Sequence, residues 1–186
     1  MLKLDEFYEQ EFLKRSMPFG AGRCALIMEG GTCLTQDLLQ RPRGANVIAI
    51  AINHHCNILF PEFAVAEDPE LANLVKDSPS TKIFGRHKLA DIDIAGALNW
   101  NDSGINAVWL ADYLEFDQIV LAGFDCSTNH TRNYWHDKEY AKSRRVKKDH
   151  LEVLEIWQDL KDNLCNPQNV YSISLELKHI FKEWKV

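Results

Sequence analysis

Short runs of apolar and β-branched residues recur along the chain, and within each run they follow one another without alternating with polar residues. The runs are RCALIME (23–29), NVIAIAI (46–52), EFAVAE (62–67), QIVLAGF (118–124) and NVYSIS (169–174), with a weaker candidate, TKIF, at 81–84. Continuous runs are typical of strands that are covered on both faces, as in parallel sheets. The pattern therefore predicts a mostly parallel sheet of about five or six strands.

Apolar residues at helical spacing separate these runs. Leu4, Phe7, Tyr8 and Phe12 predict an amphipathic helix within residues 1–20 that packs on the body of the domain. The same spacing predicts helices over 103–114, over a long segment around 146–164, and over a closing segment at 175–184.

Strands that alternate with helices indicate one doubly wound α/β domain over residues 1–186, with helices on both faces of the sheet. Right-handed crossovers are the rule for such connections. A chain of 186 residues, of which 46% are hydrophobic and 26% charged, is long enough to bury one core without disulfides.

Charge and cysteine content exclude several classes of protein. The net charge of -6 argues against a general nucleic-acid binder. The one dense basic stretch, KSRRVKK (142–148), could contact a phosphate locally, but it is more typical of a solvated helix face. The five cysteines form no C-x-x-C pair, which argues against a zinc ribbon or a secreted scaffold. With no signal peptide and no apolar run long enough for a membrane span, we expect a soluble, cytoplasmic protein.

Glycines and polar residues follow most of the predicted strands or begin the helix at 103. They are Gly30, Gly31, Thr32, Asn53, Asp68, Ser103, Gly104 and Asp125. The carboxyl ends of parallel strands share one edge of the sheet, and ligands bind there, near the point where the strand order reverses. We therefore expect these residues to converge on one site.

Some of these residues suit a phosphate. Glycines such as Gly30 and Gly31 allow a backbone to approach a phosphate closely, and Thr32 adds a hydroxyl. Ser103 and Gly104, at a helix start, would offer free amide groups to an anion. The alternatives are a simple tight turn, since the sequence has neither a dinucleotide fingerprint nor a Walker loop there, and a helix cap at Ser103.

Other residues suit a base, a sugar or a metal ion. Asn53 can bind a base or sugar edge through both functions of its amide, and Asp68 or Asp125 can accept a hydrogen bond from a ribose hydroxyl or hold a metal. Asp68 precedes Pro69, so an N-cap role is an equally good interpretation.

The segment CSTNHTRNYWHDKEY (126–140) follows the fifth predicted strand and carries His130 and His136. A loop histidine at a ligand-binding edge is a candidate general acid or base, because its pKa lies near neutral pH. The alternative is a surface histidine. His54 and His55 with Cys56 are weaker candidates for a metal site, since no spaced partner set accompanies them.

Together these features resemble a Rossmann-like superfamily that includes the bacterial CMP-sugar sialyltransferases and the archaeal-type 6-hydroxymethyl-dihydropterin diphosphokinases. Residues 103–125 look like the most specific block, a Ser-Gly, small-apolar helix, Gly-x-Asp signature, and the resemblance covers residues 24–181. Short relatives of this kind are common in bacteriophage genomes.

The resemblance implies roles for individual residues. The first loop, with Gly30, Gly31, Thr32 and Cys33, would surround the nucleotide phosphates. Asn53, after the second strand, would contact the nucleotide or donor. Ser103 and Gly104, at the helix start, would complete the donor pocket together with Asp125. A loop histidine is the catalytic base of the sialyltransferases; His136 matches it by placement, with His130 and His150 as alternatives. The family's Pro-Ser is Thr32-Cys33 here, which puts the identity of the donor in doubt.

The sequence thus predicts a nucleotide-dependent transferase. Glycosyl transfer from a nucleotide sugar, with His136 as the base and Asp125 in the donor pocket, is the first hypothesis. The first alternative is pyrophosphoryl transfer from ATP, with Mg²⁺ held by Asp68 and Asp125. The second alternative is a nucleotide-binding protein without catalysis. Trp135 and Trp184 could serve as acceptor platforms or as contacts in a homo-oligomer.

Overall fold

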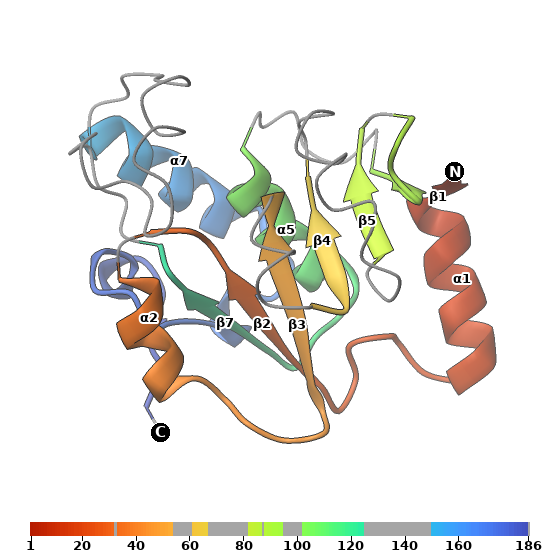
Figure 1. Cartoon of the computed structure of the whole chain (residues 1–186), viewed down its shortest axis with the longest axis horizontal. Coiled ribbons are helices and arrows are strands. Elements are labelled where there is room, and N and C mark those ends of the chain that lie inside the picture. Colours follow the sequence, from red (N-terminus) through yellow and green to blue (C-terminus); the bar gives the residue numbers. More distant parts are fainter. Residues whose placement is uncertain are drawn as a thin grey trace.

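The computed structural model describes residues 1–31, 33–53, 61–66, 82–86, 88–94, 102–124 and 150–185. It contains one sheet of nine strands, all paired in parallel (Figure 1). The strands are β1 (Leu2–Lys3), β2 (Cys24–Met28), β3 (Val47–Ile52), β4 (Phe63–Val65), β5 (Lys82–Gly85), β6 (Ile92–Asp93), β7 (Gln118–Ala122), β8 (Val170–Ser172) and β9 (Lys182–Glu183).

The strand order is β1-β6-β5-β4-β3-β2-β7-β8-β9. From β2 the chain proceeds outward through β3, β4, β5 and β6, then returns to the other side of β2 as β7 and continues outward to β8 and β9. The strand order therefore reverses between β2 and β7. This confirms the predicted doubly wound, mostly parallel α/β fold and places the expected ligand-binding edge beside these two strands.

Both faces of the sheet are buried, which explains why its strands are continuous apolar runs. In β2, Ala25 and Ile27 point into a core cluster that includes residues of helices α1 (Leu4–Arg15), α5 (Ser103–Tyr113) and α7 (His150–Asn163). Leu26 and Met28 point to the opposite face, where they cluster with Leu34 of the short helix α2 (Leu34–Asp37) and with Leu38 of the 3-10 turn η1 (Leu38–Gln40). Helices thus cover both faces, as predicted, and in Figure 1 α5 lies behind β3.

The strand count exceeds the predicted five or six because β1, β6 and β9 are each two residues long. A strand of two residues is too short to show a pattern of hydrophobic positions in the sequence. Such a strand is recognised only by its pairing with a neighbouring strand. In β9, for example, Lys182 and Glu183 pair with Tyr171 and Ser172 of β8.

The predicted closing helix over 175–184 is wrong. The segment forms a single 3-10 turn, η4 (Glu176–His179), and then strand β9. Leu177 in this turn and Ile180 and Phe181 directly after it are all buried, which explains their helical spacing. The amides of Ile180 and Phe181 both donate to the Leu177 carbonyl. A second 3-10 turn, η3 (Pro167–Asn169), precedes β8.

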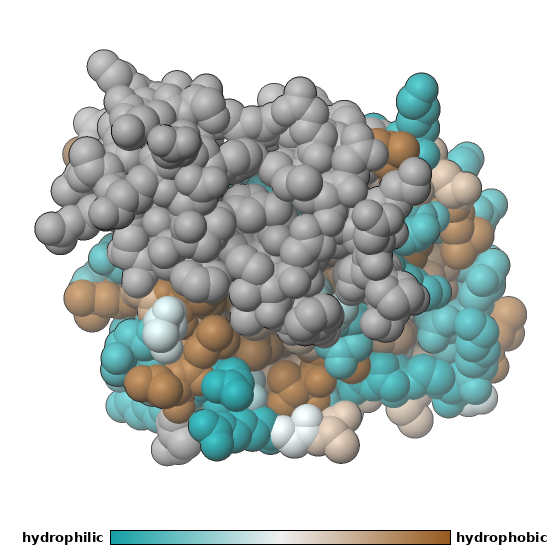
Figure 2. Space-filling view, viewed as in Figure 1, coloured by the Kyte–Doolittle hydropathy of each residue, from teal (hydrophilic) through white to brown (hydrophobic). Residues whose placement is uncertain are grey.

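The described surface carries separate exposed apolar side chains, among them Leu13, Leu39 and Leu175, and hydrophobic residues reach the surface over α2 in the face shown in Figure 2. Trp184 is half-buried instead. Its Nε1 donates to the Gln40 carbonyl over 3.0 Å, and its ring centroid lies 5.7 Å from that of Tyr171. In the part of the chain that the structure describes, no helix is long and apolar enough to cross a membrane.

Candidate functional site

The backbones that leave β2 and β7 contact each other where the strand order reverses. The Glu29 amide donates to the Ala122 carbonyl over 3.0 Å, and the Gly31 amide donates to the Gly123 carbonyl over 2.8 Å. Gly123 has a φ of +82°, a conformation that favours glycine. The two strand ends are therefore held together by close backbone contact.

Gly30 and Gly31 lie at this contact, as expected, and both are buried. The Gly31 N–H is already engaged with Gly123, so it is not free to receive a phosphate oxygen. At Gly31 the geometry favours the alternative considered above, a turn that lets two strand ends meet.

Asn53 and Ser103 also come together, although they are 50 residues apart in the chain. Ser103 Oγ donates to Asn53 Oδ1 over 3.2 Å. Asn53 follows β3 in the left-handed region, with a φ of 56°, which asparagine tolerates better than most residues. The predicted convergence of these two residues on the carboxyl edge is thus observed.

The start of α5 differs from the prediction. Asp102, the residue before the helix, is extended, and its Oδ1 accepts hydrogen bonds from the amides of Gly104 (2.9 Å) and Ile105 (3.2 Å). The expectation of a free Gly104 amide is therefore wrong. Because a carboxylate occupies the positive end of the helix, these two amides are unavailable to a phosphate.

A second carboxylate, that of Glu29, lies beside the same helix start. A Cβ on Gly104 would be 3.1 Å from Asp102 Oδ1, 3.1 Å from Phe124 Cε1 and 3.7 Å from Glu29 Oε1. Two acidic oxygens thus lie within 4 Å of one point against the backbone of the buried Gly104. The sequence interpretation missed both acids; the available signal was an acidic residue at the end of the first apolar run and another directly before the predicted helix.

Cys33 lies at the edge of a buried polar network. Its Sγ donates to Ser174 Oγ over 3.8 Å, and Ser174 Oγ donates to Asp37 Oδ2 over 2.6 Å. Asp37 and Ser174 are 6% and 0% exposed. Cys33 therefore contacts the segment after β8 at the same edge of the sheet.

Several predicted site residues lie outside the described residues. They are Thr32, Asp68, Asp125 and His136, together with the alternatives His54, His55, Cys56 and His130. His150 is the first residue of α7. Within the described ranges, no group of three or more His, Cys, Asp or Glu side chains is arranged to hold a metal ion.

The structure thus brings Gly30, Gly31, Cys33, Asn53, Ser103 and Gly104 to one edge of the sheet. The arrangement offers carboxylate oxygens, a hydroxyl and an amide group. Such groups recognise hydroxyl groups or share a divalent cation with a ligand. Comparisons of the chain with protein-family models, with curated proteins and with solved structures find no match.

Proposed function

We propose that this chain is a nucleotide-dependent transferase whose donor binds at the carboxyl edge of the sheet, between β2 and β7. The observation that carries the proposal is the convergence of polar groups from separate segments on the point where the strand order reverses. Glu29 follows β2, Asn53 follows β3, and Asp102 and Ser103 begin α5. In open α/β sheets this is the place where ligands bind.

The described part of the site suits the hydroxyl-bearing part of a donor. Glu29 and Asp102 contribute carboxylate oxygens, which accept hydrogen bonds from ribose or sugar hydroxyls and repel phosphate. Asn53 uses Oδ1 to accept from Ser103, so its amide nitrogen is oriented by that bond and can donate to a base or sugar oxygen.

The phosphates of the donor need positive charge from another part of the chain. Five of the seven residues at 142–148 are Lys or Arg, and this segment belongs to the connection between β7 and α7. That connection starts at the carboxyl end of β7, beside β2, and its Lys and Arg side chains are the groups that we propose bind the phosphates.

Glycosyl transfer is the leading reaction. The acceptor oxygen would bond to the anomeric carbon of the donor sugar as the bond from that carbon to the phosphate oxygen breaks. His136 would take the acceptor proton, and the nucleotide phosphate would leave with the electron pair. Glycosyl transfer is also the reaction that the sequence interpretation of residues 103–125 predicts.

Pyrophosphoryl transfer from ATP is the second candidate, and the two carboxylates beside Gly104 favour it. Mg²⁺ is commonly bound by one or two carboxylates together with substrate phosphates. Glu29 and Asp102, with Asp68 and Asp125 as the carboxylates predicted from the sequence, would hold the ion, which would neutralise charge on the transferred group.

A cytoplasmic location fits this function. Two of the described cysteines, Cys24 and Cys165, carry free thiols. Thiols stay reduced in a cytoplasm, whereas proteins of oxidising compartments commonly carry disulfides.

A thermal-shift panel tests the proposal. CMP, CMP-sugars and UDP-sugars would be compared with ATP in the presence and absence of Mg²⁺, and a ligand at about 100 times its Kd adds roughly 2.7 kcal/mol of stability. Stabilisation by a nucleotide sugar without metal supports glycosyl transfer, and stabilisation by ATP that requires Mg²⁺ supports pyrophosphoryl transfer. Stabilisation by none of these ligands would contradict the proposal.

Two variants connect binding with the described site. Glu29→Gln removes a carboxylate beside Gly104 and should weaken binding of the stabilising ligand, whereas Glu155→Gln, on the exposed face of α7, should not. Product formation with a candidate acceptor, measured by mass spectrometry, then separates a transferase from a binding protein. Turnover that survives His136→Ala would remove the proposed base.

A further inference from the structure

A buried carboxylate on α2 fixes the backbone at the end of β7. Asp37 Oδ2 accepts hydrogen bonds from the Gly123 amide over 2.8 Å and from Ser174 Oγ over 2.6 Å. Ser174 Oγ in turn accepts from the Phe124 amide over 2.9 Å. The two residues that follow β7 are therefore each held by a side chain from another part of the fold.

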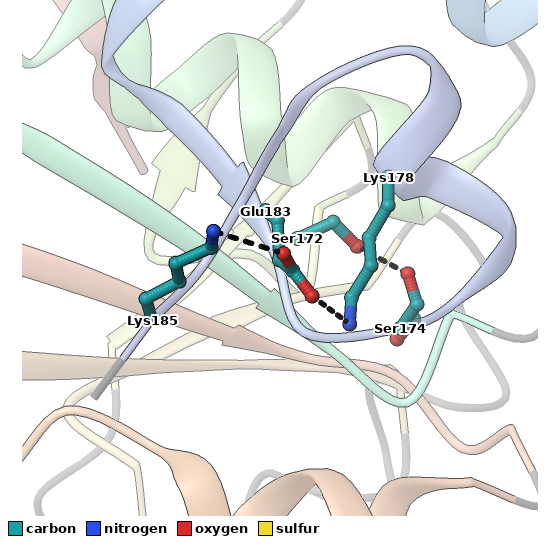
Figure 3. A network of polar contacts seen from close by, with 5 residues as sticks. All are labelled: Ser172, Ser174, Lys178, Glu183 and Lys185. Carbon is teal, nitrogen blue, oxygen red and sulfur yellow. Dashed lines mark hydrogen bonds and ion pairs between the residues drawn. The ribbon is translucent and has the colours of Figure 1, made fainter.

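Ser174 is itself held in place by its own segment. Ser172 Oγ donates to the Ser174 carbonyl over 2.8 Å, and Figure 3 shows Ser172, the last residue of β8, together with Ser174 just after it. Both serines are 0% exposed. A fully buried network of this kind is rigid when its members are satisfied, and it leaves costly unpaired groups when one member is removed.

The peptide that Asp37 fixes borders the candidate site. Phe124 is fully buried, and its Cε1 lies 3.1 Å from the point beside Gly104 where the oxygens of Glu29 and Asp102 converge. Gly123 contacts the Glu29 backbone. A shift of residues 123–124 would therefore alter the surroundings of both Gly104 and Glu29.

We propose that Asp37 is a positioning residue of this site: through Gly123 and Ser174 it fixes the backbone of residues 123–124, which borders the carboxylate oxygens of Glu29 and Asp102 beside Gly104. The inference rests on the proposed nucleotide-binding function. Its energetic reason is that small misplacements of ligand-binding groups cost much affinity or rate, even when the residue that causes them never touches the ligand.

The chain offers a matched control in Asp112. This residue is 5% exposed, like Asp37 at 6%, and its carboxylate also accepts two hydrogen bonds, from the amides of Cys165 (2.7 Å) and Asn166 (2.9 Å). It lies near the end of α5, and Asn166 directly precedes the turn η3 that leads into β8. Asp112 thus organises the amino edge of the sheet, away from the candidate site.

The experiment measures the Kd of CMP and of ATP with Mg²⁺ by calorimetry, together with urea unfolding. The proteins are the wild type, Asp37→Ala, Asp37→Asn, Ser174→Ala and Asp112→Ala, at a temperature where circular dichroism shows each to be folded. We expect Asp37→Ala to raise the Kd of the bound probe by about tenfold or more. Asp37→Asn keeps one carbonyl oxygen to accept both hydrogen bonds, so it should recover most of the affinity.

Asp112→Ala should destabilise the fold as Asp37→Ala does, yet leave the Kd within about twofold of the wild type, because distant sites act independently. If Asp37→Ala does not fold, the test compares Ser174→Ala with Asp37→Asn. Ser174→Ala should then raise the Kd more than Asp37→Asn does.

The outcomes separate this inference from the proposed function. An unchanged Kd in folded Asp37→Ala and Ser174→Ala would overturn the positioning role while leaving nucleotide binding intact. An equal rise in Asp112→Ala would overturn it as well, since general destabilisation would then explain the loss. If the wild type binds neither probe nor any nucleotide sugar, both the proposed function and this inference are wrong.

Discussion

Gly123 and Glu29 approach so closely at the end of β7 that a side chain on Gly123 has no room. A Cβ there would overlap the Glu29 carbonyl oxygen and lie 3.0 Å from the Glu29 carbonyl carbon and from Leu34 Cδ1. The backbones of Gly123 and Glu29 cannot move apart without separating the end of β7 from the end of β2. The contact therefore joins these two strand ends at the point where the strand order reverses.

Gly123→Ala should therefore destabilise the protein strongly. A left-handed φ costs an alanine about 1–2 kcal/mol, and the backbone collision adds to that, so we expect a total loss of about 3 kcal/mol or more in urea unfolding. Gly22→Ala is the control, because Gly22 also has a positive φ, +73°, but a Cβ there meets nothing within 4 Å. Equal losses in the two variants would contradict the importance of the close contact.

Asp102 should stabilise α5 as an N-cap. Asp102→Ala leaves the amides of Gly104 and Ile105 without their acceptor and should cost about 1 kcal/mol of unfolding free energy. Asp102→Asn keeps an acceptor oxygen and should lose less. Glu155→Ala, on the exposed face of α7, is the control and should keep the stability of the wild type. An Asp102→Ala variant as stable as this control would show that the cap contributes nothing.

The apolar runs predicted most of the sheet because burial on both faces is a property of each strand alone. Six strands could therefore be predicted from their own residues, without knowing which strands they pair with: β2, β3, β4, β5, β7 and β8. The closing helix failed because Leu177, Ile180 and Phe181 satisfy helical spacing within a single turn. Nothing local in the sequence distinguishes one buried turn from the start of a longer helix.

The candidate site was predictable to the extent that topology determines it. Asn53 and Ser103 were expected together because strand ends and helix starts share one edge, and they form a hydrogen bond. The role of Asp37 was not predictable, since its partners Gly123 and Ser174 are 86 and 137 residues away in the chain. An aspartate next to Leu38 and Leu39 in a short segment gives no sign of whether the fold will bury it.

Cys24 and Cys165 should differ in reactivity. Cys24 is 4% exposed, and burial raises the pKa of its thiol from 9.0 to about 12, so at pH 8 it has almost no thiolate. Cys165 is exposed. We expect iodoacetamide to modify Cys165 in the native protein while Cys24 reacts only in urea, as measured by peptide mass spectrometry. Similar native rates at the two cysteines would contradict the burial of β2.

Two tyrosines that join α1 to the end of α5 should make the stability depend on alkaline pH. The Tyr8 hydroxyl donates to Glu115, and the Tyr113 hydroxyl donates to Asp5 over 2.6 Å. The hydrogen bond to Glu115 raises the pKa of Tyr8 from 10.0 to about 12, and burial, with the bond to Asp5, raises that of Tyr113 to about 12.

Because the folded state holds both phenolic protons more tightly than the unfolded state, these hydrogen bonds stabilise the fold fully below pH 10. Their contribution should disappear as the pH rises from 10 to about 12. Urea unfolding across this range should show a steeper loss of stability in the wild type than in a variant with both Tyr8→Phe and Tyr113→Phe. That variant keeps the loss due to Cys24, whose pKa is also raised, so it isolates the tyrosines. An identical pH dependence in the two proteins would show that the phenolic hydrogen bonds do not hold α1 against α5.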